Sequence, residues 1–144
     1  MTQEIRFDDY QGFAAIEARG FTPWGPVVAI EQETVREFLR VTGAPGDGTL
    51  IPGVMLQAML PKLAPGQDWS VTGYGGAVNL GSPSIRFPVQ AQGGAHLRGR
   101  SRLSAAKPHP KGTLIAMDFE VREEGVESPC LRSTLELLYL GTKG

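Results

Sequence analysis

Cysteine, histidine and long apolar runs are all scarce in this sequence. The single cysteine, Cys130, excludes a disulfide within the chain and is typical of a reducing compartment such as the cytoplasm. The two histidines, His96 and His109, belong to no cluster with metal-ligand spacing, so we expect neither a metal site nor another cofactor. No apolar run approaches the ~18 residues that a membrane span needs, and no basic-then-apolar leader opens the chain. The net charge of -1 gives no general attraction to nucleic acid. We therefore expect a cytoplasmic protein.

The chain has enough apolar residues for one compact domain. It has 144 residues, of which 41% are hydrophobic, so residues 1–144 are expected to form a single domain. Apolar residues at helix-like spacing predict one helix within residues 7–16 and another over residues 32–41. A third helix is predicted over residues 53–63. It is apolar nearly all round apart from Gln57 and must therefore be buried.

The second half of the chain shows strand patterns separated by Gly/Pro-rich turns. Together with one short earlier strand, the predicted strands are residues 27–30, 71–80, 85–89, 95–105, 113–123 and 129–140. In the last three, apolar and charged residues alternate, and hairpins around residues 107–111 and near residue 126 bring their charged sides into one ladder. The predicted charge pairs are Arg98 with Glu120, Arg100 with Asp118, and Arg132 with Glu120.

The apolar side of this meander and the apolar helix each need a cover. An antiparallel sheet wrapped around a long central helix satisfies both, so the predicted fold class is α+β, of the hotdog kind. One such unit leaves an edge strand unpaired. We therefore expect a homodimer or a higher homo-oligomer.

Four segments of the sequence match a known pattern. They are residues 21–38, 41–63, 78–88 and 94–103. In this order they are similar to W-l-t-v-t-Q-e-r-i-d-x-F, to T-G followed by G-f-L…L-L-P-x-L, to i-N-Y-G-l-d-r-V-R-F-P and to v-G-s-r-v-R-g-r-a-r-L. The sequence thus resembles the MaoC-like (R)-specific enoyl-CoA hydratases and dehydratases, most closely their NodN-type branch. The resemblance implies a hotdog fold and an acyl-thioester ligand.

The same comparison indicates that the family's catalytic residues are missing. In the family, T-G-D is followed by W-I-H-x-D and then by a-H-G-f-L. Here Thr42 and Gly43 are followed by Ala44, the W-I-H-x-D piece is absent, and Pro52 replaces the histidine that leads the helix. Hydratases of this kind activate water with a histidine and an acid. The resemblance therefore implies a divergent protein that has lost the usual Asp/His dyad.

Three features around this loop are candidates for catalysis or substrate binding. Asp47 is the sole carboxylate of residues 44–51; it could be a displaced general base, or a turn residue that bonds its own backbone. Gln57 could bind a substrate carbonyl or an activated water, as in hotdog thioesterases, or bond a strand or a second subunit. The helix start could polarise a thioester oxygen, or be an ordinary capped terminus. Its candidate donors are the backbone N–H groups of Gly53, Val54 and Met55.

Three residues are further substrate-binding candidates: Tyr74, Asn79 and Arg86. The last two match the family's N-Y-G and V-R-F-P motifs, and each could contact ligand or hold structure. Residues 69–117 contain arginine and lysine but no acidic residue. This basic patch could bind the phosphates of CoA or an acyl-carrier protein. The charge ladder uses two of its cations and leaves four freer ones, Arg86, Arg102, Lys107 and Lys111.

Three functions of different kinds are compatible with these features. The favoured one is a dehydratase-like lyase of fatty-acyl or biosynthetic metabolism; the others are a non-catalytic acyl-binding protein or silent partner of an active hydratase, and a thioesterase. Each positioned acid or base contributes ~10²–10⁴-fold, so loss of both predicts poor hydration of ordinary enoyl-CoAs. A catalytic chain would then act on a substrate primed for elimination, isomerisation or cyclisation.

Overall fold

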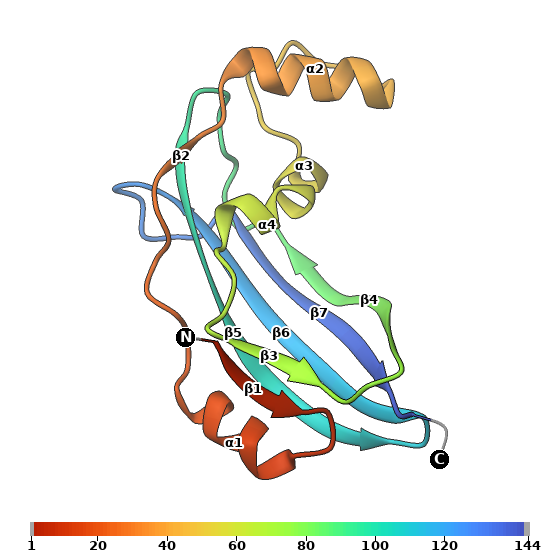
Figure 1. Ribbon diagram of the computed structural model, residues 1–144. Coiled ribbons are helices and arrows are strands. Elements are labelled where there is room, and N and C mark those ends of the chain that lie inside the picture. The colour runs from red at the N-terminus through yellow and green to blue at the C-terminus, as the bar shows by residue number, and fades with distance from the viewer. Residues whose placement is uncertain (1, 143–144) are drawn as a thin grey trace.

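The computed structural model describes residues 2–142 and contains one large, curled sheet (Figure 1). In chain order the elements are β1 (Gln3–Arg6), α1 (Tyr10–Ala18), β2 (Val28–Ala29), α2 (Gln32–Thr42), α3 (Gly53–Ala58), α4 (Leu60–Leu63), β3 (Trp69–Thr72), β4 (Gly76–Arg86), β5 (His96–His109), β6 (Gly112–Glu123) and β7 (Leu131–Leu140). The large sheet has the order β2-β5-β6-β7-β4, and every neighbouring pair in it is antiparallel. A separate pair, β1 and β3, is parallel.

Alternation along the long strands produces two different faces. In β5 the residues Leu97, Ser101 and Leu103 are buried, whereas Arg98 and Arg102, which alternate with them, are half-buried or exposed. Because successive side chains of a strand point to opposite faces, the sheet has one apolar and one charged face, as predicted.

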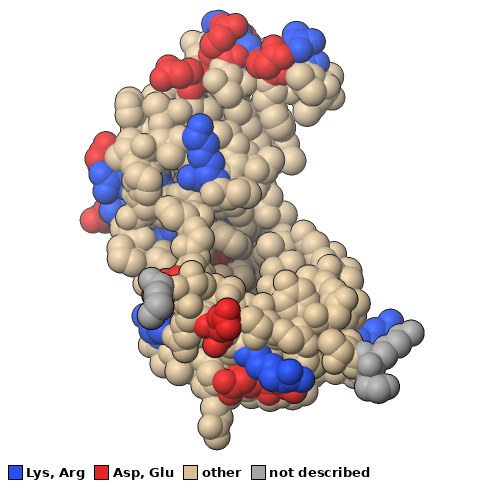
Figure 2. All heavy atoms as spheres, in the orientation of Figure 1, with Lys and Arg blue, Asp and Glu red and all other residues tan. Residues whose placement is uncertain are grey.

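The apolar face is covered at both ends of the sheet. Helices α2, α3 and α4 cover one end, where Val35, Leu56 and Leu131 belong to one buried cluster. Helix α1 and the β1–β3 pair cover the other end, where Phe13 and Ile115 belong to a second cluster. Figure 2 shows the surface hollowed between these two ends.

The central helix predicted over residues 53–63 is interrupted. It is divided into α3 and α4 at Met59, whose backbone leaves the helical range with φ -91° and ψ 3°. Pro61 explains the break, because it has no N–H to donate to the carbonyl of Gln57 and its ring crowds that turn. The helical segment that the sheet encloses is therefore shorter and bent.

The strand predicted over residues 71–80 is also divided. Gly73, with φ +75°, turns the chain between β3 and β4. β4 then continues through Pro83 to Arg86, so only the first two residues of the strand predicted at residues 85–89 are strand, as the end of β4. Pro83 is tolerated because β4 is an edge strand and its pairing with β7 shifts register on both sides of Gly81.

The register of the first hairpin differs from the prediction by two residues. The observed pairs are Arg98 with Arg122, Arg100 with Glu120 and Arg102 with Asp118. The predicted partners of Arg98 and Arg100 were wrong because the turn lies at residues 110–111 and Ser104 is an extra, bulged residue in β5. The third predicted pair, Glu120 with Arg132, is confirmed. Arg102, expected to be free, is paired with Asp118.

The architecture agrees with the predicted α+β hotdog fold: a curled antiparallel sheet around short apolar helices. Helices α1 and α2 also lie where the apolar spacing predicted them. The parallel pairing of β1 with β3 was not predicted. No helix within residues 2–142 is both long enough and apolar enough to cross a membrane.

Candidate functional site

A cavity of about 730 Å³ lies at the start of α3. One wall is the loop between α2 and α3, and the opposite wall is the segment that follows β4. Besides Gly53 and Leu56 of α3, its lining consists of Leu39, Pro45, Gly46, Asp47, Gly48, Thr49, Leu50, Ile51, Pro52, Phe87, Val89, Gln90, Ala91 and Cys130. The lining is largely apolar, with Asp47 as its sole carboxylate, and includes no histidine.

Contacts with α2 hold the loop that forms this wall. Gly43 ends α2 in the left-handed conformation, with φ +75°. The backbone carbonyl of Asp47 then accepts hydrogen bonds from Arg36 Nε at 3.0 Å and from Gln32 Nε2 at 3.4 Å. Gly48 packs so closely that a Cβ there would lie 2.8 Å from the Gln32 carbonyl oxygen. The loop is therefore fixed against one side of α2.

Asp47 is both a lining residue and a turn residue. Its Oδ1 accepts a hydrogen bond of 2.9 Å from the backbone N–H of Thr49, as in an Asx turn. Hydrogen bonds from the Thr49 side chain and backbone, with a smaller contribution from the Arg36 charge, lower the pKa of Asp47 below its ordinary range. The carboxylate is therefore ionised at neutral pH. It can accept a hydrogen bond, but its low pKa makes it a weak general base.

The start of α3 is covered by an aromatic ring. A Cβ added to Gly53 would lie 2.5 Å from Cζ of Phe87, so the ring packs directly on the Gly53 backbone. The N–H of Met55 already donates to the Pro52 carbonyl at 3.0 Å. Of the three expected donors, Gly53 and Val54 therefore remain, since the first N–H groups of a helix have no acceptor within it. With six residues, α3 is too short for a sizeable macrodipole, so these two N–H groups are the donors available at its start.

Cys130 lies at the inner end of the cavity and is unsuited to nucleophilic attack. Its side chain is 1% exposed, and Sγ donates to the Val121 carbonyl at 3.5 Å. Burial raises the pKa of the thiol from 9.0 to about 11. The thiol is therefore protonated at neutral pH and contributes apolar surface.

Gln57 does not line the cavity. Its Nε2 points toward Ser82 Oγ, 3.5 Å away in β4, and its buried Oε1 has no hydrogen-bond partner within residues 2–142. The amide thus lies between α3 and the edge strand, close to the bulge around Gly81. This position gives no support to a thioesterase reaction at the cavity.

The other three candidates also lie away from the cavity lining. Asn79 Oδ1 accepts a 2.9 Å bond from the Gly81 N–H and so supports the bulge of β4. Tyr74 follows β3 and packs edge-to-face on Tyr139, with 4.8 Å between ring centroids. Arg86 lines a shallow cavity on the charged face of the sheet. One chain therefore brings Asp47 and Gly53 together, but not Tyr74, Asn79 or Arg86.

Neither histidine lines the cavity. His96 is exposed at the start of β5. His109 is at the β5–β6 turn, where its Nδ1 accepts a bond from the Lys111 N–H. No group of three or more His, Cys, Asp or Glu residues within the described chain is placed to hold a metal ion.

Sequence reasoning missed Phe87 as a site residue. The ring reaches the start of α3 because β4 ends at Arg86 and the chain then turns toward the loop of residues 45–52. The R-F-P motif was the available signal.

Known proteins resemble this chain in sequence and in fold. No family model matches it. The 3-hydroxyacyl-thioester dehydratase Z of Mycobacterium tuberculosis is 31% identical over 131 residues, covering 81% of this chain and 84% of the relative. The ChsH1-ChsH2 complex from Mycobacterium tuberculosis matches with a TM-score of 0.69 and 14% identity, over 93% of this chain and 96% of that one. A MaoC-like dehydratase from Rhodospirillum rubrum matches with a TM-score of 0.59 and 12% identity, over 84% and 91%.

These comparisons confirm the fold and the family. The solved structures share the curled sheet, and at their low identity they bear on the fold alone. The sequence relative shares nearly a third of its residues over most of both chains, and the expectation of a dehydratase-like enzyme agrees with it. The chain therefore belongs to the MaoC-like hotdog dehydratase family.

Proposed function

We propose that this chain is a divergent, dehydratase-like lyase of the NodN-type branch that binds an acyl thioester in the cavity at the start of α3. The observation that carries the proposal is the cavity itself: about 730 Å³, largely apolar, with Asp47 as its sole carboxylate. The related M. tuberculosis protein is by name a 3-hydroxyacyl-thioester dehydratase, which supports a thioester of CoA or acyl-carrier protein as the ligand. The lone, buried Cys130 fits a reducing compartment, and the cytoplasm is the proposed location.

The thioester carbonyl is proposed to lie against the first turn of α3. There the N–H groups of Gly53 and Val54 can donate to its oxygen and stabilise the negative charge that develops when a Cα proton leaves. Phe87 and Leu56 supply apolar walls for the acyl chain. Asp47 is the nearest ionised acceptor on the lining and can hold a hydroxyl group or a water molecule.

This arrangement favours substrates that need little acid–base help. The cavity lining includes no histidine, and the low pKa of Asp47 limits it as a base, which supports the inference that the family's usual Asp/His dyad is lost. Positioning and carbonyl polarisation remain, and these suffice where the substrate is already primed for elimination, isomerisation or cyclisation. Ordinary (R)-specific hydration of enoyl-CoA is expected to be slow.

The alternative, a silent partner of an active hydratase, is favoured by one specific observation. Strand β4 is an unpaired edge of the sheet, and its large apolar side chains are exposed: Val78, Leu80 and Ile85. Such an edge invites pairing with a second chain. The proposed state is a homodimer or higher homo-oligomer; pairing with a chain that carries the His and acid would make this protein the non-catalytic half.

Thioester binding is tested by calorimetric titration with butyryl-CoA and dodecanoyl-CoA. Leu50→Trp places a large ring on the cavity wall, where Leu50 is 44% exposed and can be replaced without disturbing the core. Val126→Trp is the matched control in the β6–β7 turn, 38% exposed. We expect binding to the wild type and to Val126→Trp, and at least tenfold weaker binding to Leu50→Trp. Absence of binding at millimolar ligand would refute the proposal.

Catalysis is tested separately with crotonyl-CoA, longer enoyl-CoAs and their 3-hydroxyacyl counterparts. The wild type is compared with Asp47→Ala and with Asp68→Ala, an exposed carboxylate far from the cavity. Turnover well below that of ordinary enzymes, lowered further only by Asp47→Ala, is the expected result. Rapid hydration that is unaffected by Asp47→Ala would contradict both the missing dyad and the proposed role of Asp47.

A further inference from the structure

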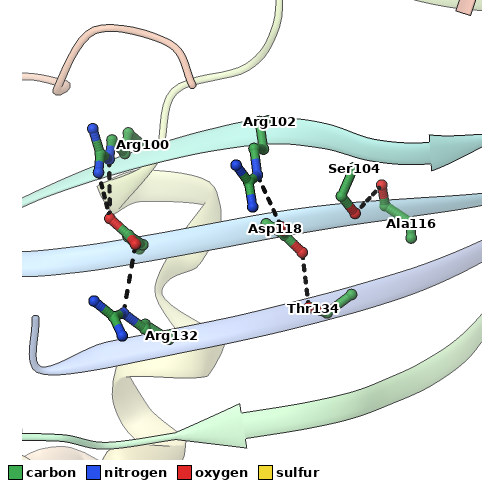
Figure 3. A network of polar contacts seen from close by, with 8 residues as sticks. Arg100, Arg102, Ser104, Ala116, Asp118, Arg132 and Thr134 are labelled. Atoms are coloured by element: carbon green, nitrogen blue, oxygen red, sulfur yellow. Dashed lines mark hydrogen bonds and ion pairs between the residues drawn. The ribbon is translucent and has the colours of Figure 1, made fainter. Parts of the chain in front are cut away.

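The charged face of the sheet carries a cluster that the proposed function does not use. We call it the arginine face, and it consists of Arg86, Arg98, Arg100, Arg102, Arg122 and Arg132. Three carboxylates, Asp118, Glu120 and Glu124, pair with four of these six cations. Figure 3 shows the central part of the cluster, spread over β5, β6 and β7 on one side of the sheet. A further carboxylate, Glu136, lies beyond it along β7, beside the bulge of β4.

Part of the positive charge of the arginine face has no carboxylate partner, as the residues paired across neighbouring strands show. One row runs across four strands as Arg100, Glu120, Arg132 and Arg86. Glu120 Oε2 accepts two bonds from Arg100, at 3.0 and 2.7 Å, whereas Glu120 Oε1 is 3.5 Å from Arg132 Nε. Arg86 has no ion pair within residues 2–142. Two arginines thus face each other on β4 and β7 beside a carboxylate that is already engaged.

A second like-charge pair lies one row away. Arg98 and Arg122 are directly opposite on β5 and β6, where like charges are destabilising. Arg98 bonds Glu124 at 3.0 Å, but Arg122 has no carboxylate partner among the described residues, and its buried Nε has no acceptor. Retaining two such pairs costs stability, which points to a role outside the isolated chain.

Two aromatic rings hold the guanidinium groups in place. Arg100 lies over both Phe21 and Trp24, at 4.2 and 4.4 Å from the ring centroids, and Arg122 lies over Trp24 at 4.3 Å. Stacked guanidinium groups have little conformational entropy left to lose on binding. The guanidinium groups of Arg100 and Arg122 are therefore held in place before any anion binds.

A shallow cavity of about 300 Å³ lies within the arginine face. It is bordered by Arg86, Arg102 and Arg132, and also by Asp118 and Glu120. Three positive and two negative groups leave one positive charge in excess, which a single carboxylate neutralises. A phosphate with its second charge would be repelled by the two carboxylates already present.

We propose that the arginine face is a docking surface for an acidic helix of a partner protein. One carboxylate binds between Arg86 and Arg132, and a second binds at Arg122. Strands are ~4.8 Å apart and residues ~3.4 Å along a strand, so these two points are separated by about 10 Å. Positions i and i+7 of a helix lie on one side about 10.5 Å apart, which matches this spacing. Arginine-rich, lysine-poor surfaces are typical of protein interfaces.

The same features argue against nucleic acid. Phe21 and Trp24 are covered by guanidinium groups, so their rings offer no platform on which bases can stack. Carboxylates alternate with the arginines and would repel a continuous phosphate backbone. The pattern fits a surface of separate carboxylates.

The test uses the full chain and two alanine-based helical peptides, each with two glutamates. In the first peptide the two glutamates are seven positions apart and lie on the same side of the helix. In the second peptide they are five positions apart and lie on different sides of the helix. Inorganic phosphate and a short DNA duplex are titrated in parallel. Binding is followed through the Nε–Hε NMR signals of the arginine side chains.

The variant Arg86→Gln/Arg122→Gln is compared with Arg6→Gln/Arg40→Gln, which removes two exposed arginines elsewhere. Because Arg122 is stacked on Trp24, Arg86→Gln alone is included as a variant that removes no ion pair or aromatic stack within residues 2–142.

We expect the peptide with spacing seven to shift the signals of Arg86, Arg122 and Arg132. Loss of two ion pairs should weaken its binding about tenfold in the double variant and several-fold in Arg86→Gln, with no change in the control variant. The proposal is overturned if no signal shifts at 1 mM peptide, or if both peptides and both double variants behave alike. It is also overturned if DNA or phosphate shifts the same signals at lower concentration.

Discussion

Replacing Gly53 by alanine tests the contact that covers the start of α3. The new Cβ would lie 2.5–2.6 Å from three ring atoms of Phe87, so the ring must move away. Phe87 is 46% exposed, so the burial that the ring can lose is about half of a full one, roughly 1–1.5 kcal/mol, with some overpacking strain in addition. Against this, Gly→Ala at a helical position with negative φ stabilises by about 0.4–1 kcal/mol. The expected net effect is a destabilisation of about 1 kcal/mol.

The sign of this effect should reverse when Phe87 is removed. In the Phe87→Ala background nothing opposes the new methyl group, so Gly53→Ala should stabilise the protein by about 0.5 kcal/mol. The coupling energy in this double-mutant cycle is then about 1.5 kcal/mol. Urea unfolding of the four proteins measures it, and melting temperatures should differ by roughly 3 °C per kcal/mol. An equal destabilisation by Gly53→Ala in both backgrounds would falsify the packing of Phe87 on Gly53 and with it the described wall of the cavity.

Three further predictions follow from the structure. Burial raises the pKa of Cys130 to about 11, so between pH 9 and 11 the thiol loses its proton in the unfolded chain but keeps it in the folded one. The free energy of unfolding should therefore fall by about 2–3 kcal/mol over that interval. Urea titrations at pH 8.5 and 11 measure this fall, which Cys130→Ala should lack. Arg100→Lys should lower the free energy of unfolding by about 1 kcal/mol, because lysine keeps the charge but loses the two aromatic stacks and the paired bonds to Glu120. An unchanged free energy of unfolding would show that these contacts contribute nothing. Ile85→Glu places a charge on the exposed β4 edge and should convert an oligomer into a monomer, as measured by light scattering. A monomeric wild type would contradict the proposed pairing of that edge.

Local patterns in the sequence were sufficient for the fold class. The alternation in β5, β6 and β7 predicted an apolar and a charged face, since side-chain direction depends only on position along a strand. The apolar stripe of α2 and its glycine stop were equally local. The break at Met59 was also within reach, because Pro61 is a strong signal that was outweighed by the apolar run around it.

The tertiary structure decided which residues meet. A displaced turn and one bulge at Ser104 together moved the charged pairs of the first hairpin by two residues, and the partners of Arg98 and Arg100 changed with them. Asp47 and Gly53 share a cavity with Phe87 because two loops far apart in sequence pack at the same end of the sheet. Tyr74 and Arg86 were candidates for substrate binding and lie outside that cavity, since their positions depend on where β4 begins and ends. Local periodicity fixes the direction of a side chain, but the distance between residues of different elements depends on register and packing, which long-range contacts alone determine.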